Sequence, residues 1–142
     1  AGQAPGATVA TATAAPLVLL AEDNDANAET IAEYLRVKGY RLLRVTDGRA
    51  AIAAVQQHHP DIILMDVQMP DMDGLEAMYH IRQDLRLQSI PIIALTALAM
   101  PGDEARCRAA GANGYLAKPL RLRQLMVMLQ TMLMETETGG HG

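Results

Sequence analysis

Five polar side chains follow short apolar runs, at the points where buried strands would end. Glu22 and Asp23 follow LVLLA, Asp66 follows IILM, Thr96 follows PIIAL, and Lys118 follows GYLA. Open α/β sheets bind their ligands at the carboxyl ends of the strands. If the first, third, fourth and fifth runs are neighbouring parallel strands, then three carboxylates, one hydroxyl and one amine converge at that edge.

This combination of side chains suits a metal ion and a phosphoryl group. Three carboxylates close together raise one another's pKa values, and a divalent cation removes that conflict. An all-oxygen site with few carboxylates, which leaves room for water and phosphate, matches Mg²⁺ best. The amine of Lys118 and the hydroxyl of Thr96 could bind the oxygens of a phosphoryl group on Asp66. Carboxylate nucleophiles that form aspartyl phosphates are established chemistry.

The elements that must position these residues alternate along the chain. Strands are expected at residues 17–21, 40–45, 61–66, 91–95 and 113–117. Helices are expected at residues 24–38, 49–57, 74–87, 101–110 and 120–134. Buried strands alternating with helices predict an α/β fold, a doubly wound parallel sheet with helices on both faces. Residues 1–16 have the composition of a flexible linker and residues 135–142 form a polar tail, so one domain is expected over residues 17–134.

Composition bounds the class of protein and its partners. The chain has 142 residues, half of them hydrophobic, which suits one domain with one core. The net charge is -4 and the basic residues are scattered, which argues against a nucleic-acid partner. The single cysteine, Cys107, cannot form an internal disulfide, which favours a reducing compartment and a cytoplasmic location. No apolar run approaches the length of a membrane span, so we expect no membrane contact by this segment.

Four motifs together resemble the receiver domain of bacterial two-component signalling. They are LVLLAEDN, DIILMDVQMPDMDG, PIIALTA and GANGYLAKP, in the order and spacing of that family. The resemblance runs from about residue 17 to about residue 133. It implies a flavodoxin-like (βα)5 fold with strand order 2-1-3-4-5.

The resemblance also implies roles for individual residues. Asp66 matches the phospho-acceptor, and Glu22 and Asp23 match the acidic pair that binds Mg²⁺. The main-chain carbonyl of Gln68 matches the remaining protein ligand of the metal. The first acid is Glu rather than Asp, as is common in receivers of hybrid kinases. Its extra methylene could make it a water-mediated ligand.

The remaining matches concern the response to phosphorylation. Thr96 matches the switch hydroxyl, Tyr115 the switch aromatic, and Lys118 the lysine that binds the phosphoryl group. The Lys118–Pro119 peptide is typically cis in this family, and an X–Pro bond has only a small trans preference. Gln68 and Leu98 lie two residues beyond the acceptor and the switch hydroxyl, where similar domains tune the lifetime of the phosphoryl group. Tyr115 could equally be a simple packing residue.

The expected function is therefore a phosphorylation-dependent signalling switch. A histidine kinase or a histidine phosphotransfer domain would donate a phosphoryl group to Asp66 with Mg²⁺ present. Thr96 and Tyr115 would then bias a surface around the fourth and fifth helices, through which a protein partner or a second copy could bind. The methionine-rich final helix suits such a surface, although a loosely amphipathic terminal helix explains its pattern equally well.

Several alternatives remain open from the sequence. The EDN and LTALAMPGD segments favour the C-terminal part of a hybrid sensor histidine kinase, while a stand-alone regulator is the alternative. An unphosphorylated interaction module of the same fold would explain the pattern without chemistry. A phosphatase with an Asp nucleophile is disfavoured, because Gln68 stands where such enzymes carry a second Asp. Whether the chain counts as an enzyme stays open, because the domain would catalyse only its own phosphorylation and dephosphorylation, and a parent chain could be a histidine kinase.

Overall fold

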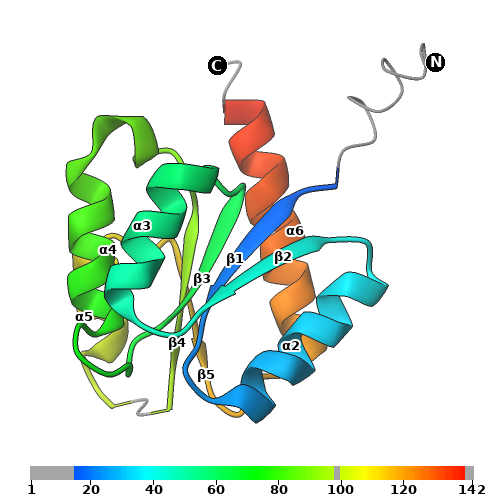
Figure 1. The fold of residues 1–142 in the computed structure, drawn as a ribbon, viewed down its shortest axis with the longest axis horizontal. Coiled ribbons are helices and arrows are strands. Elements are labelled where there is room, and N and C mark those ends of the chain that lie inside the picture. Colours follow the sequence, from blue (N-terminus) through cyan, green and yellow to red (C-terminus); the bar gives the residue numbers. More distant parts are fainter. Residues whose placement is uncertain (1–14, 98–99, 140–142) are drawn as a thin grey trace.

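Five parallel strands form one sheet in the order β2-β1-β3-β4-β5 (Figure 1). The computed structural model describes residues 15–97 and 100–139. The strands are β1 (Leu17–Ala21), β2 (Arg41–Val45), β3 (Ile62–Asp66), β4 (Ile92–Thr96) and β5 (Gly114–Ala117). The fold class and the strand order expected from the sequence are confirmed.

The register brings the carboxyl ends of the strands to one edge of the sheet. Ala21 pairs with Met65, so β1 and β3 end together. Asp66 pairs with Leu95, and Thr96 pairs with Ala117. The residues at the carboxyl ends of β1, β3, β4 and β5 are therefore neighbours across the sheet, as the sequence predicted.

The helices cover both faces of the sheet. They are α2 (Asp25–Val37), α3 (Gly48–His58), α4 (Gly74–Gln83), α5 (Asp103–Ala110) and α6 (Leu122–Gly139), with a short 3-10 helix η1 (Leu85–Leu87) after α4. Figure 1 shows α2 and α6 on one face and α3, α4 and α5 on the other. Asn24, Asp47 and Asp73 each accept a hydrogen bond from a backbone N–H in the first turn of α2, α3 and α4, respectively. These side chains satisfy donors that a helix start leaves unpaired.

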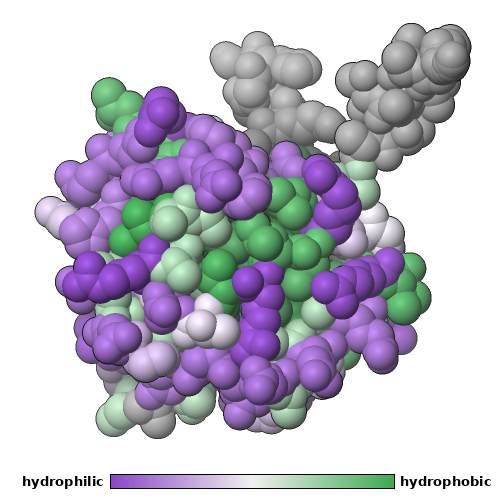
Figure 2. Space-filling view, in the orientation of Figure 1, coloured by the Kyte–Doolittle hydropathy of each residue, from purple (hydrophilic) through white to green (hydrophobic). Residues whose placement is uncertain are grey.

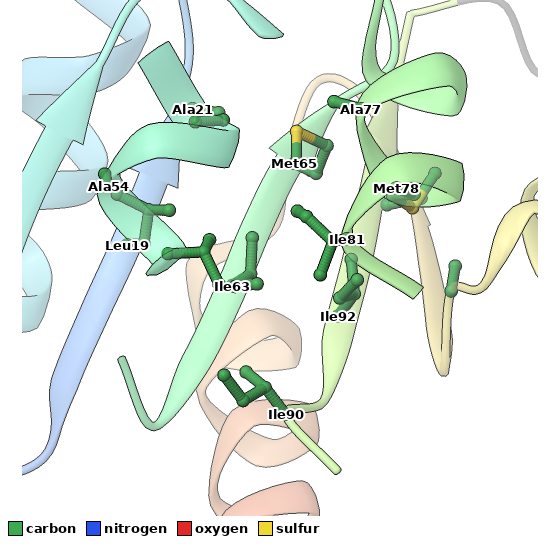
Figure 3. Packing of buried hydrophobic residues seen from close by; sticks show 14 of the residues in the cluster. Leu19, Ala21, Ala54, Ile63, Met65, Ala77, Met78, Ile81, Ile90 and Ile92 are labelled. Atoms are coloured by element: carbon green, nitrogen blue, oxygen red, sulfur yellow. The ribbon is translucent and has the colours of Figure 1, made fainter. Parts of the chain in front are cut away.

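The alternating side chains of the central strands fill two apolar layers. Leu19, Ile63 and Ile92 belong to the layer under α3, α4 and α5. Figure 3 shows Ile63, Met65 and Ile92 of the sheet facing Met78 and Ile81 of α4. Leu20, Leu64 and Ile93, together with their neighbours, belong to the layer under α2 and α6. The central strands read as continuous apolar runs because both of their faces are covered.

The edge strand β2 is less buried than the central strands. Figure 2 shows hydrophobic side chains gathered in the middle of one face of the molecule, in the region of β2 between α2 and α3. Leu42, Leu43 and Val45 of this strand are half-buried.

Within the described residues, no helix is both long and apolar enough to cross a membrane.

The prediction of a helix at residues 74–87 was wrong for the last turn, residues 84–87. α4 ends at Gln83, and Asp84 adopts an extended backbone with φ -91° and ψ 115°. The Asp84 carboxylate accepts a hydrogen bond from the Arg86 N–H and caps η1. An aspartate can compete in this way with the helical backbone for hydrogen bonds, which explains why the helix stops there.

Other element boundaries also differ from the prediction. α5 begins at Asp103 rather than at residue 101, because Gly102 has a left-handed φ of 90°. α6 continues to Gly139, five residues beyond the predicted end and into the segment predicted as a polar tail. Most of the linker predicted at residues 1–16, the last three residues of the chain, and Leu98 lie outside the described residues.

Candidate functional site

Three carboxylates meet at the carboxyl edge of the sheet. Glu22 and Asp23 follow β1, and Asp66 is the last residue of β3. Carboxylate oxygens of all three residues lie within 4.8 Å of one another. Glu22 and Asp66 are buried, with exposed fractions of 0% and 1%, whereas Asp23 is exposed. The structure therefore brings together the acids that the sequence predicted.

Lys118 joins the two buried acids. Its ammonium donates to Asp66 Oδ2 at 2.7 Å and to Glu22 Oε1 at 2.8 Å. Its own backbone N–H donates to the Thr96 carbonyl at 2.7 Å, which ties the end of β5 to β4. The Lys118–Pro119 peptide bond is cis, as the family resemblance implied. Glu22 thus contacts the lysine directly in this structure, which the sequence did not predict.

The protonation equilibria of this cluster reflect burial and pairing. Burial raises the pKa of the Glu22 carboxyl, and the hydrogen bond from Lys118 only partly offsets that rise. Burial alone would lower the pKa of Lys118, but its bonds to Asp66 and Glu22 outweigh burial, so the pKa lies above its usual value. One ammonium therefore serves two buried carboxylates, and the cluster retains an excess of negative charge.

The donor set fits a hard divalent cation. Every side-chain ligand that Glu22, Asp23 and Asp66 offer is a carboxylate oxygen, which Mg²⁺ and Ca²⁺ prefer. The site supplies only a few protein oxygens, as Mg²⁺ sites that keep several water ligands do. The excess negative charge left by Lys118 gives a cation a clear electrostatic role.

The loop after β3 is held tightly against the site. The backbone N–H of Gln68 donates to Asp66 Oδ1 at 2.9 Å, while the Gln68 side chain is exposed. The Gly74 N–H donates to the Val67 carbonyl at 2.9 Å and closes the loop. A Cβ on Gly74 would lie inside the contact distance of the Asp66 carbonyl oxygen and 2.8 Å from Val67 Cα. Only glycine fits at this position without moving the end of β3.

Thr96 and Tyr115 lie on neighbouring strands. Thr96 ends β4 and is 3% exposed. Tyr115 of β5 pairs with Ala94 and packs, half-buried, against the layer under α3, α4 and α5. Both residues lie where the family resemblance implied, and their roles as switch residues remain predictions.

A groove opens beside the acidic cluster. It has a volume of about 540 Å³ and reaches Glu22 and Lys118 at its base. Asn27, Thr30 and Ile31 of α2 line one side, and the segment 118–122 lines the other. Glu22 and Lys118 of the cluster are therefore among the residues that line a partly apolar groove.

Some contributors to the site were not identified from the sequence. Gly74 and Gly48 each follow an aspartate, and this Asp-Gly pairing could have indicated two close approaches. A Cβ on Gly48 would lie 2.5 Å from the Met72 carbonyl oxygen. Arg44 contacts the loop that carries Glu22 and Asp23, and its position within a strand pattern gave no such signal.

Comparison with known proteins gives the same family as the resemblance of the sequence motifs. The family model described as Response regulator receiver domain matches residues 18–130. The polar-differentiation response regulator DivK of Brucella ovis is 37% identical over 116 residues, which cover 82% of this chain and 94% of that protein.

Solved structures of similar domains agree with the fold. The receiver domain of a sensor histidine kinase from Pseudomonas aeruginosa PAO1, solved with a magnesium ion coordinated in its active-site cleft, is 42% identical with a TM-score of 0.79. The match covers 84% of this chain and 98% of that domain. A CheY-like receiver domain from Methanospirillum hungatei, 22% identical, has a TM-score of 0.83 over 89% of this chain and 99% of its own, and so shares the fold. The chain belongs to the response regulator receiver domain family and is a receiver domain of a two-component signalling system.

Proposed function

We propose that Asp66 accepts a phosphoryl group from a phosphohistidine of a histidine kinase or a histidine phosphotransfer domain, with Mg²⁺ bound beside it. One observation carries this proposal. Asp66 is a buried carboxylate at a strand end, within reach of two further carboxylates and hydrogen-bonded to Lys118. A purely structural aspartate would not need this excess of negative charge around it.

Asp66, Gln68 and Lys118 would have different roles in phosphoryl transfer. An oxygen of Asp66 forms a bond to phosphorus while the bond between phosphorus and the donor's imidazole nitrogen breaks. The Gln68 N–H and the Lys118 ammonium each hold one oxygen of Asp66 and so orient the carboxylate before attack. As the phosphoryl group arrives, Lys118 can pair with its oxygens instead, because the ammonium already lies within hydrogen-bond distance of the acceptor.

The metal would be held by Glu22, Asp23, Asp66 and the main-chain carbonyl of Gln68. A bound Mg²⁺ would supply positive charge to the carboxylates and to the oxygens of the incoming group. Glu22 also contacts Lys118, so this residue would position the lysine as well as serve the metal. The Glu22 side chain is longer than that of an aspartate, so from the end of β1 it would reach both Lys118 and the metal.

The phosphodonor would approach through the groove between α2 and the segment 118–122. The groove leads to Glu22 and Lys118 and combines apolar residues such as Ile31 and Leu122 with polar ones such as Asn27. A helix that presents a histidine would bury its apolar side there and reach the acceptor.

The response to phosphorylation would run through Thr96 and Tyr115 to α5 and α6. Thr96 is buried on the strand next to Asp66, and Tyr115 of β5 packs against the apolar layer that includes Cys107 of α5. A small shift of both residues would alter how α5 rests on the sheet. That change would bias binding of a protein partner or of a second copy.

The finer origin of the chain is also a proposal. We infer the receiver part of a hybrid histidine kinase, located in the cytoplasm, supported by the 42% identity to the Pseudomonas kinase receiver. The alternative is a stand-alone regulator, supported by the Brucella protein, 94% of which is matched here. The complete coding sequence distinguishes the two.

The test is phosphorylation by a small-molecule phosphodonor with Mg²⁺, followed by intact-protein mass spectrometry, since the chain has no tryptophan for fluorescence. The wild type should gain one phosphoryl group, and Asp66→Asn should gain none. Asp71→Asn is the matched control, because Asp71 is an exposed aspartate in the same loop. Undiminished labelling of Asp66→Asn would overturn the proposal, and failure of the wild type to bind Mg²⁺ would favour the unphosphorylated interaction module.

A further inference from the structure

Arg44 spans the loop that carries the acidic pair. It is the fourth residue of the edge strand β2 and pairs with Leu20 of β1. Its Nε donates to the Glu22 carbonyl oxygen at 3.0 Å, and its Nη1 lies 2.8 Å from Asp25 Oδ1. The guanidinium therefore contacts the chain immediately before and two residues after Asp23.

The main chain of Glu22 is held by β2 on both sides. Its N–H donates to the Val45 carbonyl at 3.0 Å, a backbone bond that does not depend on residue type. Its carbonyl accepts a hydrogen bond from the Arg44 Nε while Nη1 contacts Asp25, and the planar fork of arginine makes both contacts at once. The Glu22 carboxylate also accepts the Asn24 N–H at 3.1 Å, which tightens the turn around Asp23.

In the described part of the chain, the position of the Arg44 guanidinium leaves one of its buried nitrogens unpaired, which is unfavourable for the folded state. Its Nη2 is buried without a hydrogen-bond partner among the described residues. A buried donor left unpaired lowers the stability of the folded state. The side chain as a whole is 27% exposed, so the guanidinium lies near the surface. The contacts of Nε and Nη1 with the acidic loop are the interactions that hold it inward.

We propose that Arg44 is a positioning residue of the metal site. It fixes the backbone from Glu22 to Asp25, so that the Asp23 carboxylate faces Glu22 and Asp66. Its positive charge is paired with Asp25, which is not one of the three clustered acids. The inference rests on the proposed function only for the identity of the ion.

The test separates geometry from charge. Arg44→Lys keeps the charge but loses the fork, and Arg44→Met loses both. Positioning predicts that both variants weaken Mg²⁺ binding, by about tenfold, the lower end of the effect of residues that orient metal ligands. A purely electrostatic role predicts that neither variant binds Mg²⁺ more weakly. Arg44→Lys would then bind Mg²⁺ normally, and Arg44→Met would bind it more tightly, because a nearby cation is gone.

Arg41→Lys is the matched control. Arg41 begins the same strand, and its Nε donates to a carbonyl, that of Ala15, at 2.8 Å, at the opposite end of β1. This variant should bind Mg²⁺ like the wild type. Asp25→Asn removes the ion pair but leaves the bond to Glu22, so it should weaken binding less than Arg44→Lys. The double variant should be no worse than Arg44→Lys alone, because both changes break one linked contact.

The measurements are calorimetric titration with Mg²⁺ and amide hydrogen exchange of residues 23–26 in its absence. Arg44→Lys should bind more weakly and exchange faster in this segment while keeping the fold, checked by circular dichroism. If Arg44→Lys binds Mg²⁺ like the wild type, the positioning role is overturned. If the wild type itself binds no Mg²⁺, the proposed function fails, and hydrogen exchange alone then decides whether Arg44 anchors the loop. If Arg44→Lys does not fold, Arg44→Met carries the test, because positioning predicts weaker Mg²⁺ binding and a purely electrostatic role predicts tighter binding.

Discussion

At the scale of residues, the central feature is one lysine shared by two buried acids. Removing one partner of a buried ion pair is strongly destabilising, because the other charge stays buried without compensation. Here the loss of Lys118 would leave Glu22 and Asp66 buried without their cation, because their side chains are only 1% and 2% exposed, respectively. The lysine therefore stabilises the folded state as well as serving the proposed reaction.

We predict that Lys118→Met lowers the free energy of unfolding by about 3 kcal/mol at neutral pH. Without the lysine, the pKa of Glu22 rises further above its usual value, since the hydrogen bond from Lys118 lowers it. A folded state with a raised carboxyl pKa holds a proton that the unfolded state releases. The stability of the variant should therefore fall as pH rises from the ordinary glutamate range through the raised pKa.

Urea unfolding across that pH range measures this penalty, and added Mg²⁺ should recover part of it by binding the folded state. Lys38→Met is the control, since Lys38 lies on the surface over the Tyr34 ring, and should change stability by less than about 1 kcal/mol. A penalty for Lys118→Met that does not vary with pH would contradict the assignment of buried, ionised partners.

At the scale of elements, the strand ends and the helix starts are coupled through close backbone contacts. The loop after β3 leaves Asp66, passes Gln68 and returns to Val67 through the Gly74 N–H. Gly74 begins α4, so the first turn of that helix rests on Asp66 itself. The geometry of Asp66 therefore depends on the start of a helix as well as on its own strand.

We predict that Gly74→Ala destabilises the fold by about 1–3 kcal/mol and weakens Mg²⁺ binding, because the added methyl group overpacks the Asp66 carbonyl and Val67 Cα. Urea unfolding and Mg²⁺ titration test the two effects separately. Gly102→Ala is the contrast. Gly102 has a φ of 90° and open space around its Cβ position, so alanine there should cost about 1 kcal/mol of backbone strain and leave Mg²⁺ binding unchanged. Equal Mg²⁺ affinity of Gly74→Ala and the wild type would show that the contact does not position the acceptor.

At the scale of the whole molecule, two apolar layers on the two faces of the sheet define the folded unit. The Ala15 carbonyl accepts a hydrogen bond from the Arg41 Nε, so a tertiary contact already precedes β1. On α6, Leu125 and Leu129 are fully buried, and Leu133 packs at the margin of the layer. The domain boundaries at residues 17 and 134 stay predictions, which fragments of the chain can test.

We predict that a chain of residues 15–135 unfolds in urea at the same midpoint as the full chain. It retains Leu125 and Leu129, the side chains of α6 described as fully buried. A chain that ends at residue 127 should be far less stable, because it lacks Leu129, and truncating one buried leucine side chain alone costs about 2–5 kcal/mol. Loss of stability in the longer fragment would place the domain boundary outside residues 15–135.

The sequence by itself determined the architecture and the membership of the acidic cluster. Strands buried on both faces must read as apolar runs, so the runs before Glu22, Asp66, Thr96 and Lys118 located four strand ends. Parallel strands place those ends on one edge, and the acids, the hydroxyl and the amine were therefore predicted as neighbours. Helix ends were less accurate, as the break at Asp84 shows, because local hydrogen bonds by an aspartate can override a helical pattern.

Only the tertiary structure decided how these groups pair. Lys118 and Glu22 are 96 residues apart in sequence, and no periodicity reports which acid an ammonium will contact. The fit of Gly74 against Asp66 and the reach of Arg44 across the acidic loop depend on side-chain conformations and on distances between elements. A sequence pattern records which face of an element is buried. The partners on that face are fixed only when the elements pack.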